Sequence, residues 1–219
     1  MSGLLTANPV YKPFRYPWAY EAWLMQQRLH WLPEEVPLAE DVRDWAKSLS
    51  PAERNLLTQV FRFFTQSDVE VNNCYMQHYA SVFKPTEVRM MLAAFSNIET
   101  IHISAYSHLL DTLGMPETEY EAFLHYKEMT DKWDYMRGFN VDSKRDIAKT
   151  MAMFGAFTEG LQLFASFAIL LNFPRFNKMK GMGQIVAWSA RDETLHMQSV
   201  VRLFKTFIAE NPEVWDEDL

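Results

Sequence analysis

Apolar residues recur at intervals of three and four along most of this chain, which is the spacing of one face of an α-helix. The pattern predicts long helices over about 51–80, from 84 to 113, from 142 or 143 to 173, and from 182 or 184 to about 209, with a shorter amphipathic helix over about 117–132. No segment alternates strictly between apolar and polar residues over several turns, and neither Asn-Gly nor Asp-Gly occurs. The sequence therefore predicts an all-α fold.

Local signals support these boundaries. Ser50, Pro51 and Glu53 form the pattern of an N-cap, a first-turn proline and the returning glutamate of a capping box. Gly114-Met115-Pro116 is expected to end the second long helix, and Pro174 to follow the end of the third.

Two of the long helices carry a Glu-x-x-His pair at their centre, Glu99/His102 and Glu193/His196. The helical faces that contain them are otherwise mostly apolar: Met91, Phe95, Glu99, His102, Tyr106 and Leu109 in the second helix, and Ile185, Ser189, Glu193, His196, Val200 and Leu203 in the fourth. A carboxylate turned inward on such a face costs several kcal/mol unless it is paired or bound to metal. Two such faces indicate a shared cationic partner.

The other two long helices each contain one further carboxylate within an apolar stretch. Asp68 precedes Glu99 by 31 residues and Glu159 precedes Glu193 by 34, about one helix plus a turn in each case. The pattern predicts two metal ions inside a four-helix bundle. The predicted ligands are Asp68, Glu99, His102, Glu159, Glu193 and His196. Carboxylate and imidazole ligands suit iron or manganese, so we expect two iron ions, two manganese ions or one of each.

Composition narrows the class of protein. The 219 residues are 48% hydrophobic with few glycines and prolines, so we expect a single domain over 1–219. The net charge of −7, without a basic stripe, argues against nucleic acid or an anionic membrane as partner. Cys74 is the only cysteine, which excludes a disulfide within the chain and a structural zinc site built on thiolates. Residues 1–20 lack a signal-peptide pattern, and 161–172 is too short to cross a bilayer, so we expect a cytoplasmic protein.

With these residues in place, the chain resembles the small, radical-generating subunit of class I ribonucleotide reductase. The matching segments are Trp31-Leu32-Pro33-Glu34-Glu35, Phe64-Thr65-Gln66-Ser67-Asp68, Glu99-Thr100-Ile101-His102, Glu159-Gly160 and Arg191-Asp192-Glu193-Thr194-Leu195-His196. The resemblance implies a ferritin-like four-helix bundle with additional helices, in which residues 1–30 form an N-terminal arm. It also implies that Asp68, Glu99 and His102 bind one metal, and Glu159, Glu193 and His196 chiefly the other. Homodimerisation and a large partner subunit that reduces ribonucleotides are further implications.

Three more residues receive roles from the resemblance. Tyr106 stands seven residues after Glu99 and matches the tyrosine that the family oxidises to a stable radical, whereas Val200 holds the equivalent position after Glu193. Trp31 matches a tryptophan that passes electrons between the surface and the metal site. Asp192 matches the carboxylate that joins this tryptophan to the metal-bound imidazole of His102.

The chain departs from the family at its end. Family members continue through further helices to a flexible tail with a radical-transfer tyrosine, whereas this sequence ends at Leu219 and has no tyrosine after Tyr135. We therefore expect a split or truncated product, or a fragment of a longer polypeptide, with a missing C-terminal fragment as one potential partner.

The sequence leads to one principal function and two alternatives. The first is an oxidoreductase, the small subunit of ribonucleoside-diphosphate reductase, in which a di-metal centre activates oxygen or a related oxidant and oxidises Tyr106. An alternative is a ligand-binding oxidase of the same family or a fatty acyl desaturase, and another is ferritin-like iron storage. Asp68 in place of a glutamate, together with Tyr106 and Trp31, favours the reductase subunit.

Overall fold

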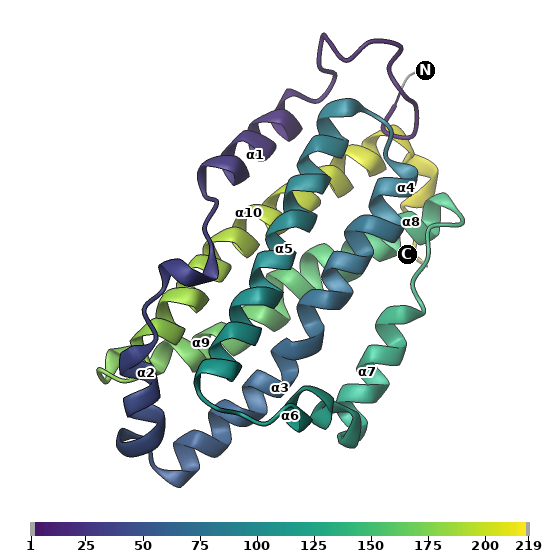
Figure 1. Cartoon of the computed structure of the whole chain (residues 1–219). Helices are drawn as coiled ribbons and strands as arrows, with labels where there is room; N and C mark the ends of the chain where they lie inside the picture. The colour runs from purple at the N-terminus through teal and green to yellow at the C-terminus, as the bar shows by residue number, and fades with distance from the viewer. Residues whose placement is uncertain (1–2, 218–219) are drawn as a thin grey trace.

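A computed structural model describes residues 3–217, apart from the side chains of Thr65 and Phe123. Every regular element in that part of the chain is helical, which confirms the all-α prediction. Figure 1 shows the long helices lying side by side, with the shorter ones at the ends and edges of the bundle. The domain predicted over 1–219 also includes residues 1–2 and 218–219, which lie outside the described part of the chain.

Four long helical segments form the bundle, and two of them contain π-helical turns. The first is α3 (Pro51–Asn73), continued by the π-helical η3 (Cys74–Tyr79) and by α4 (Ala80–Val82). The second is α5 (Thr86–Thr112). The third is α8 (Lys144–Met151), the π-helical η5 (Ala152–Gln162) and α9 (Leu163–Arg175), and the fourth is α10 (Lys180–Glu210).

Shorter elements surround these four. They are α1 (Pro17–Arg28), η1 (Pro33–Glu35), α2 (Ala39–Arg43), η2 (Asp44–Ser48), α6 (Thr118–Glu121), η4 (Ala122–His125), α7 (Lys127–Arg137) and η6 (Pro212–Val214). The helix α1, inside the expected N-terminal arm, packs against α5 and α10. The arm therefore contributes side chains to the interior.

The predicted capping box is present at the start of α3. The Ser50 hydroxyl accepts a hydrogen bond from the Glu53 backbone N–H at 3.2 Å, and the Ser50 N–H donates to the Glu53 carboxylate at 2.7 Å. Gly114, with φ of 72°, lies just after the C-terminal end of α5, where its position before Pro116 predicts the end of the helix.

Three of the predicted element boundaries were wrong. Pro174 lies inside the last turn of α9, where its ring packs against α10 so closely that a Cβ on Gly183 would stand 2.3 Å from Pro174 Cγ. The helix α10 begins at Lys180, before both glycines, because the Asp41 carboxylate accepts the N–H groups of Gly181 and Met182, both at 2.8 Å. Asp41 is remote in sequence, so no local signal marks this start. The predicted short helix over 117–132 is divided into α6, η4 and α7, and its last part extends to Arg137.

Two apolar clusters fill the bundle. One contains Phe64, Leu109 and Ile185, and the other contains Phe95 and Phe207. Along α3 and α10, the stretches between the residues that belong to the two clusters contain the buried carboxylates Asp68, Asp192 and Glu193. A group of buried carboxylates and histidines therefore lies where the two apolar clusters meet.

Candidate metal centre

The structure brings all six predicted ligands together at this boundary, each with at most 2% of its surface exposed. They are Asp68 from α3, Glu99 and His102 from α5, Glu159 from η5, and Glu193 and His196 from α10. The ligands of α5 and α10 occupy the interior faces that their helical spacing predicts, and Asp68 and Glu159 lie within the apolar stretches where they were expected. Their ability to bind metal stays a prediction.

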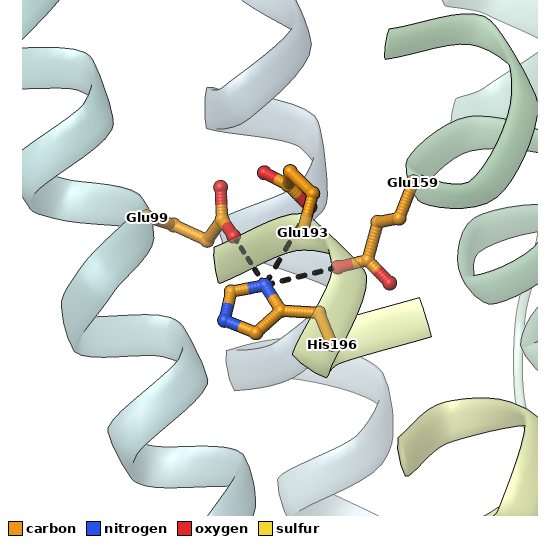
Figure 2. Close-up of side chains that lie close together, drawn as sticks. All are labelled: Glu99, Glu159, Glu193 and His196. Atoms are coloured by element: carbon orange, nitrogen blue, oxygen red, sulfur yellow. Dashed lines mark ion pairs between the residues drawn. The ribbon is translucent and has the colours of Figure 1, made fainter. Parts of the chain in front are cut away.

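One group of ligands surrounds the His196 imidazole. Figure 2 shows three carboxylates converging on Nδ1 of His196 from three segments. The distances from this nitrogen are 3.0 Å to Glu99 Oε1, and 3.6 Å to both Glu159 Oε1 and Glu193 Oε2.

The second group consists of Asp68, Glu99 and His102. Nδ1 of His102 lies 3.5 Å from Glu99 Oε2 and 3.3 Å from Glu193 Oε1. Glu99 thus belongs to both groups, and each of its oxygens faces a different histidine. Glu193 also presents one oxygen to each histidine. The resemblance implied that Glu99 serves a single ion, whereas in the structure Glu99 and Glu193 each present one oxygen to each histidine.

Several of these polar atoms have no hydrogen-bond partner among the described residues. They are Asp68 Oδ2, both carboxylate oxygens of Glu99 and of Glu193, and Nδ1 of His196. Buried polar atoms are normally paired, because leaving each one unsatisfied costs about 1–3 kcal/mol. Their concentration at one point, with oxygen and imidazole donors only, fits two hard or borderline cations.

The titration of the cluster reflects its excess of carboxylates. Burial, followed by the charge of Glu99, raises the pKa of Asp68 well above its usual range, and burial raises the pKa of Glu159 to about 7. Burial alone would lower the pKa of His102 and His196, but the surrounding carboxylates outweigh it and raise both well above the ordinary value. Burial would also raise the pKa of Glu99, but the two histidines lower it. Protons therefore take the place of cations in the metal-free cluster.

A hydrogen-bonded chain leads away from His102. Its Nε2 lies 3.3 Å from Asp192 Oδ2, which also accepts a hydrogen bond of 2.8 Å from the Trp31 indole N–H. Burial would raise the pKa of Asp192, but the hydrogen bond from His102 outweighs it and lowers this pKa. The structure therefore connects Trp31 and Asp192 to the cluster as the resemblance implies. The Trp31 ring also lies 5.2 Å from that of the half-buried Trp188.

Sequence reasoning missed Gln26, which comes from α1. Its side-chain oxygen lies 3.1 Å from Nε2 of His196, and its Nε2 donates to Asp192 Oδ1 at 3.4 Å. Gln26 is 3% exposed and therefore orients His196 as Asp192 orients His102. A buried glutamine on α1 carries no local signal of this role, because its partners are more than 160 residues away.

Tyr106 lies on the Asp68 side of the cluster, 3% exposed. Its ring stacks on Phe64 with centroids 4.7 Å apart, and its hydroxyl donates to Ser189 Oγ at 3.4 Å. Burial, followed by the charge of Asp68, raises the pKa of Tyr106 far above its usual value. Phe167 stacks on Phe64 in turn, so the phenol has the dry aromatic surround expected from the sequence.

A second buried phenol, Tyr75, was also missed. It lies in η3 and donates a hydrogen bond of 2.6 Å to Glu159 Oε1. Burial, together with Glu159, raises the pKa of Tyr75 well above its usual value, so the hydroxyl stays protonated. Its position seven residues after Asp68 is the signal that could have identified it. The remaining histidines, His30, His78, His108 and His125, belong to neither ligand group in the described part of the chain.

The bundle, with six carboxylate and imidazole side chains facing its interior, has the architecture of the ferritin-like helical class. The family model for the ribonucleotide reductase small chain matches residues 8–219, so the chain belongs to that family. A probable ribonucleoside-diphosphate reductase small subunit of Invertebrate iridescent virus 6 is 48% identical over 222 residues, which cover 95% of this chain and 62% of that protein. The chain therefore spans about three-fifths of this relative's length.

Solved structures share the fold. The ribonucleotide reductase R2 subunit from Clostridium botulinum superposes with a TM-score of 0.90 at 22% identity, covering 100% of this chain and 71% of that one. Dimanganese(II)-NrdF from Streptococcus sanguinis gives a TM-score of 0.80 at 19% identity, covering 96% of this chain and 73% of that one. These matches confirm the expected ferritin-like bundle.

Proposed function

We propose that this chain binds two metal ions and serves as the radical-generating small subunit of a ribonucleoside-diphosphate reductase. The observation that carries the proposal is the convergence of six buried ligands, four of which have side-chain atoms without a hydrogen-bond partner among the described residues: Asp68, Glu99, Glu193 and His196. Asp68, Glu99 and His102 would hold one ion, and Glu159, Glu193 and His196 the other, with Glu99 and Glu193 reaching both.

We infer iron or manganese as the metal. The donor set contains carboxylates and imidazoles without thiolate, which suits either element. The dimanganese(II) state named for the Streptococcus sanguinis protein supports manganese as one occupant. Two iron ions, or one ion of each element, suit the same ligands.

When bound, the metal pair supplies the one-electron oxidation that Tyr106 requires. The chain's own residues prepare the phenol for it. Phe64 and Phe167 exclude water around the ring, which slows quenching of a radical. Asp68 lies on the phenol's side of the cluster, and as a metal-bound carboxylate it would place a negative charge there that favours loss of an electron from Tyr106.

Trp31 and Asp192 would provide the connection for electrons. The indole N–H donates to Asp192, and the same Asp192 oxygen lies beside Nε2 of His102. This arrangement fixes the tautomer of His102 so that Nδ1 faces the carboxylates. Proton and electron can then pass along one hydrogen-bonded chain.

The remaining proposals concern the assembly. We infer one domain over 1–219, a homodimer, and a large ribonucleotide-reducing partner subunit. Exposed apolar side chains at Phe157, Leu161 and Ile169 support association through the third long segment. Size-exclusion chromatography with light scattering distinguishes a dimer from a monomer.

We also infer a cytoplasmic protein without a membrane or nucleic-acid partner. Residues 144–175 form the only helical stretch in the described chain that is long and apolar enough by composition to span a membrane. Glu159 within it is buried beside His196, which suits the interior of a bundle. The net charge of −7 opposes binding to polyanions.

The test is electron paramagnetic resonance of the protein after anaerobic loading with iron or manganese and exposure to an oxidant. Binding of two ions per chain and a persistent tyrosyl signal that disappears in Tyr106→Phe are expected, whereas Tyr120→Phe, a half-buried tyrosine outside the cluster, should keep the signal. A radical that survives Tyr106→Phe refutes the role of this residue. Two-electron oxidation of a bound hydrocarbon without a radical favours the oxidase or desaturase alternative, and loading of many iron atoms favours storage.

A further inference from the structure

Two phenols flank the ligand cluster, one at each end. Tyr106 follows the ligand Glu99 by seven residues on α5, and Tyr75 follows the ligand Asp68 by seven residues on the segment of α3 and η3. Seven residues are nearly two helical turns, so each phenol lies on the same face as its ligand. Because α3 and α5 are antiparallel neighbours (Figure 1), the two phenols point to opposite ends of the cluster.

Aromatic packing repeats this arrangement. Tyr106 stacks on Phe64, which precedes Asp68 by four residues. Tyr75 packs edge-on against Phe95, which precedes Glu99 by four residues, with ring centroids 6.0 Å apart. Each phenol is therefore held by a phenylalanine one turn before the ligand of the opposite helix.

The hydroxyl groups of the two phenols have different hydrogen-bond partners. That of Tyr106 makes a long contact with Ser189, whereas that of Tyr75 donates a 2.6 Å hydrogen bond to Glu159 Oε1. This is the same oxygen that faces Nδ1 of His196. Glu99 and Glu193, by contrast, have no hydrogen-bond donor on either oxygen among the described residues. The two carboxylates that face both histidines contact them as ion pairs at 3.0–3.6 Å, whereas Glu159, which faces only His196, is also held by a phenol.

The backbone on both sides of the hydrogen bond between Tyr75 and Glu159 is π-helical rather than α-helical. Tyr75 and Glu159 both lie in π-helical segments, η3 and η5, whose hydrogen bonds differ from those of the flanking α-helix. Such segments occur frequently at functional sites. Because η5 is not a regular α-helix at Glu159, the hydrogen bond from the Tyr75 side chain helps to fix the direction of the Glu159 carboxylate.

We propose that Tyr75 is a positioning residue, whose hydroxyl holds the Glu159 carboxylate in the orientation that serves the ion on the His196 side. This inference rests on the two-ion function proposed above and adds a residue to it. Hydrogen-bond partners of metal ligands typically change metal affinity by 10–100-fold when removed. Loss of the Tyr75 hydroxyl should therefore weaken one of two ions selectively.

Tyr79 supplies the matched control. It lies in the same π-helical segment, is equally buried at 1% exposure, and packs against Tyr75 with ring centroids 5.5 Å apart. Its hydroxyl donates to the Thr150 carbonyl at 3.4 Å, away from the ligands. Tyr75→Phe and Tyr79→Phe thus remove the same group from the same surroundings, and only the first removes a contact with a ligand.

The experiment is an anaerobic titration of the full chain with Mn²⁺, in which the paramagnetic resonance signal of free Mn²⁺ measures the unbound ion. Wild type and Tyr79→Phe should bind two ions with the same pair of affinities. Tyr75→Phe should keep one affinity and lose about tenfold in the other. Equal affinities in Tyr75→Phe and Tyr79→Phe, or an equal loss at both sites, would overturn the role of Tyr75 alone. Fewer than two ions in the wild type would overturn the proposed function together with it.

A second measurement tests the role of Tyr75 without the Tyr75→Phe substitution, in case that variant does not fold. In the Tyr106→Phe background, infrared difference spectra of Mn²⁺ loading should show a shift in the C–O stretching band of one tyrosine, because the Glu159 oxygen that accepts its hydrogen bond changes partner. No tyrosine band shift on loading would refute the proposal.

Discussion

The contact between Gly155 and Val200 offers a quantitative test of how the third and fourth long segments hold the cluster. An ideal Cβ on Gly155 would stand 2.4 Å from Val200 Cγ1 and 2.9 Å from Val200 Cβ, far inside van der Waals contact. Overpacking of this kind costs about 1–3 kcal/mol, and such a short contact lies at the upper end. Alanine gains about 1 kcal/mol over glycine in helix propensity. Gly155→Ala should therefore destabilise the metal-free protein by about 2 kcal/mol.

Val200→Ala separates the clash from other effects. Val200 is 1% exposed, so loss of two methyl groups should cost about 2 kcal/mol including the cavity. In the double variant the 2.4 Å contact is gone and the 2.9 Å contact between Cβ positions remains, so the relief is partial. The double variant should be at least about 1 kcal/mol more stable than the sum of the two single changes.

Urea unfolding of the metal-free chains measures these values from the midpoint and the slope. Glu159 lies one turn beyond Gly155, so displacement of η5 should also weaken the His196-side ion more than the other. A Gly155→Ala chain as stable as wild type, or strictly additive effects in the double variant, would show that the close approach of η5 and α10 does not constrain the bundle.

Three further predictions follow from the cluster and its supports. Metal affinity should fall by at least about tenfold per pH unit as the pH drops from 7 to 6, because the raised pKa values of Glu159 and His196 leave protons that a cation must displace. Calorimetry in buffers of different ionisation enthalpy measures the number of protons released on binding. A metal affinity that does not change with pH would contradict the assignment of these ligands. Asp192→Asn should weaken metal binding about 10–100-fold through loss of the charge that orients its histidine, and the Mn²⁺ titration would show an unchanged affinity if the contact were incidental. Asp41→Asn should lower the free energy of unfolding measured in urea by about 1–3 kcal/mol, because one acceptor atom and the charge at the start of α10 are lost. A change below about 0.5 kcal/mol would exclude this capping role.

The sequence was sufficient to predict the long helices and the six side chains that meet between them as candidate ligands. Helical spacing is a local property, and a carboxylate on an apolar face, as at Glu99, has a large desolvation cost wherever the helix packs. Local caps such as Ser50 and Glu53 marked one boundary for the same reason, since both partners lie within one turn. The matching faces of two helices then implied a common centre before any contact was known.

Contacts between residues distant in the chain were decided only by tertiary packing. Gln26 reaches His196 because α1 packs on α5 and α10, and Asp41 caps α10 from 140 residues away. The register of η3 and η5 determines that Tyr75 meets Glu159. Val200, the position equivalent to Tyr106, lies against η5 at Gly155. These features depend on how helices approach one another, and periodicity along a single helix carries no information about the side chains that another helix will place against it.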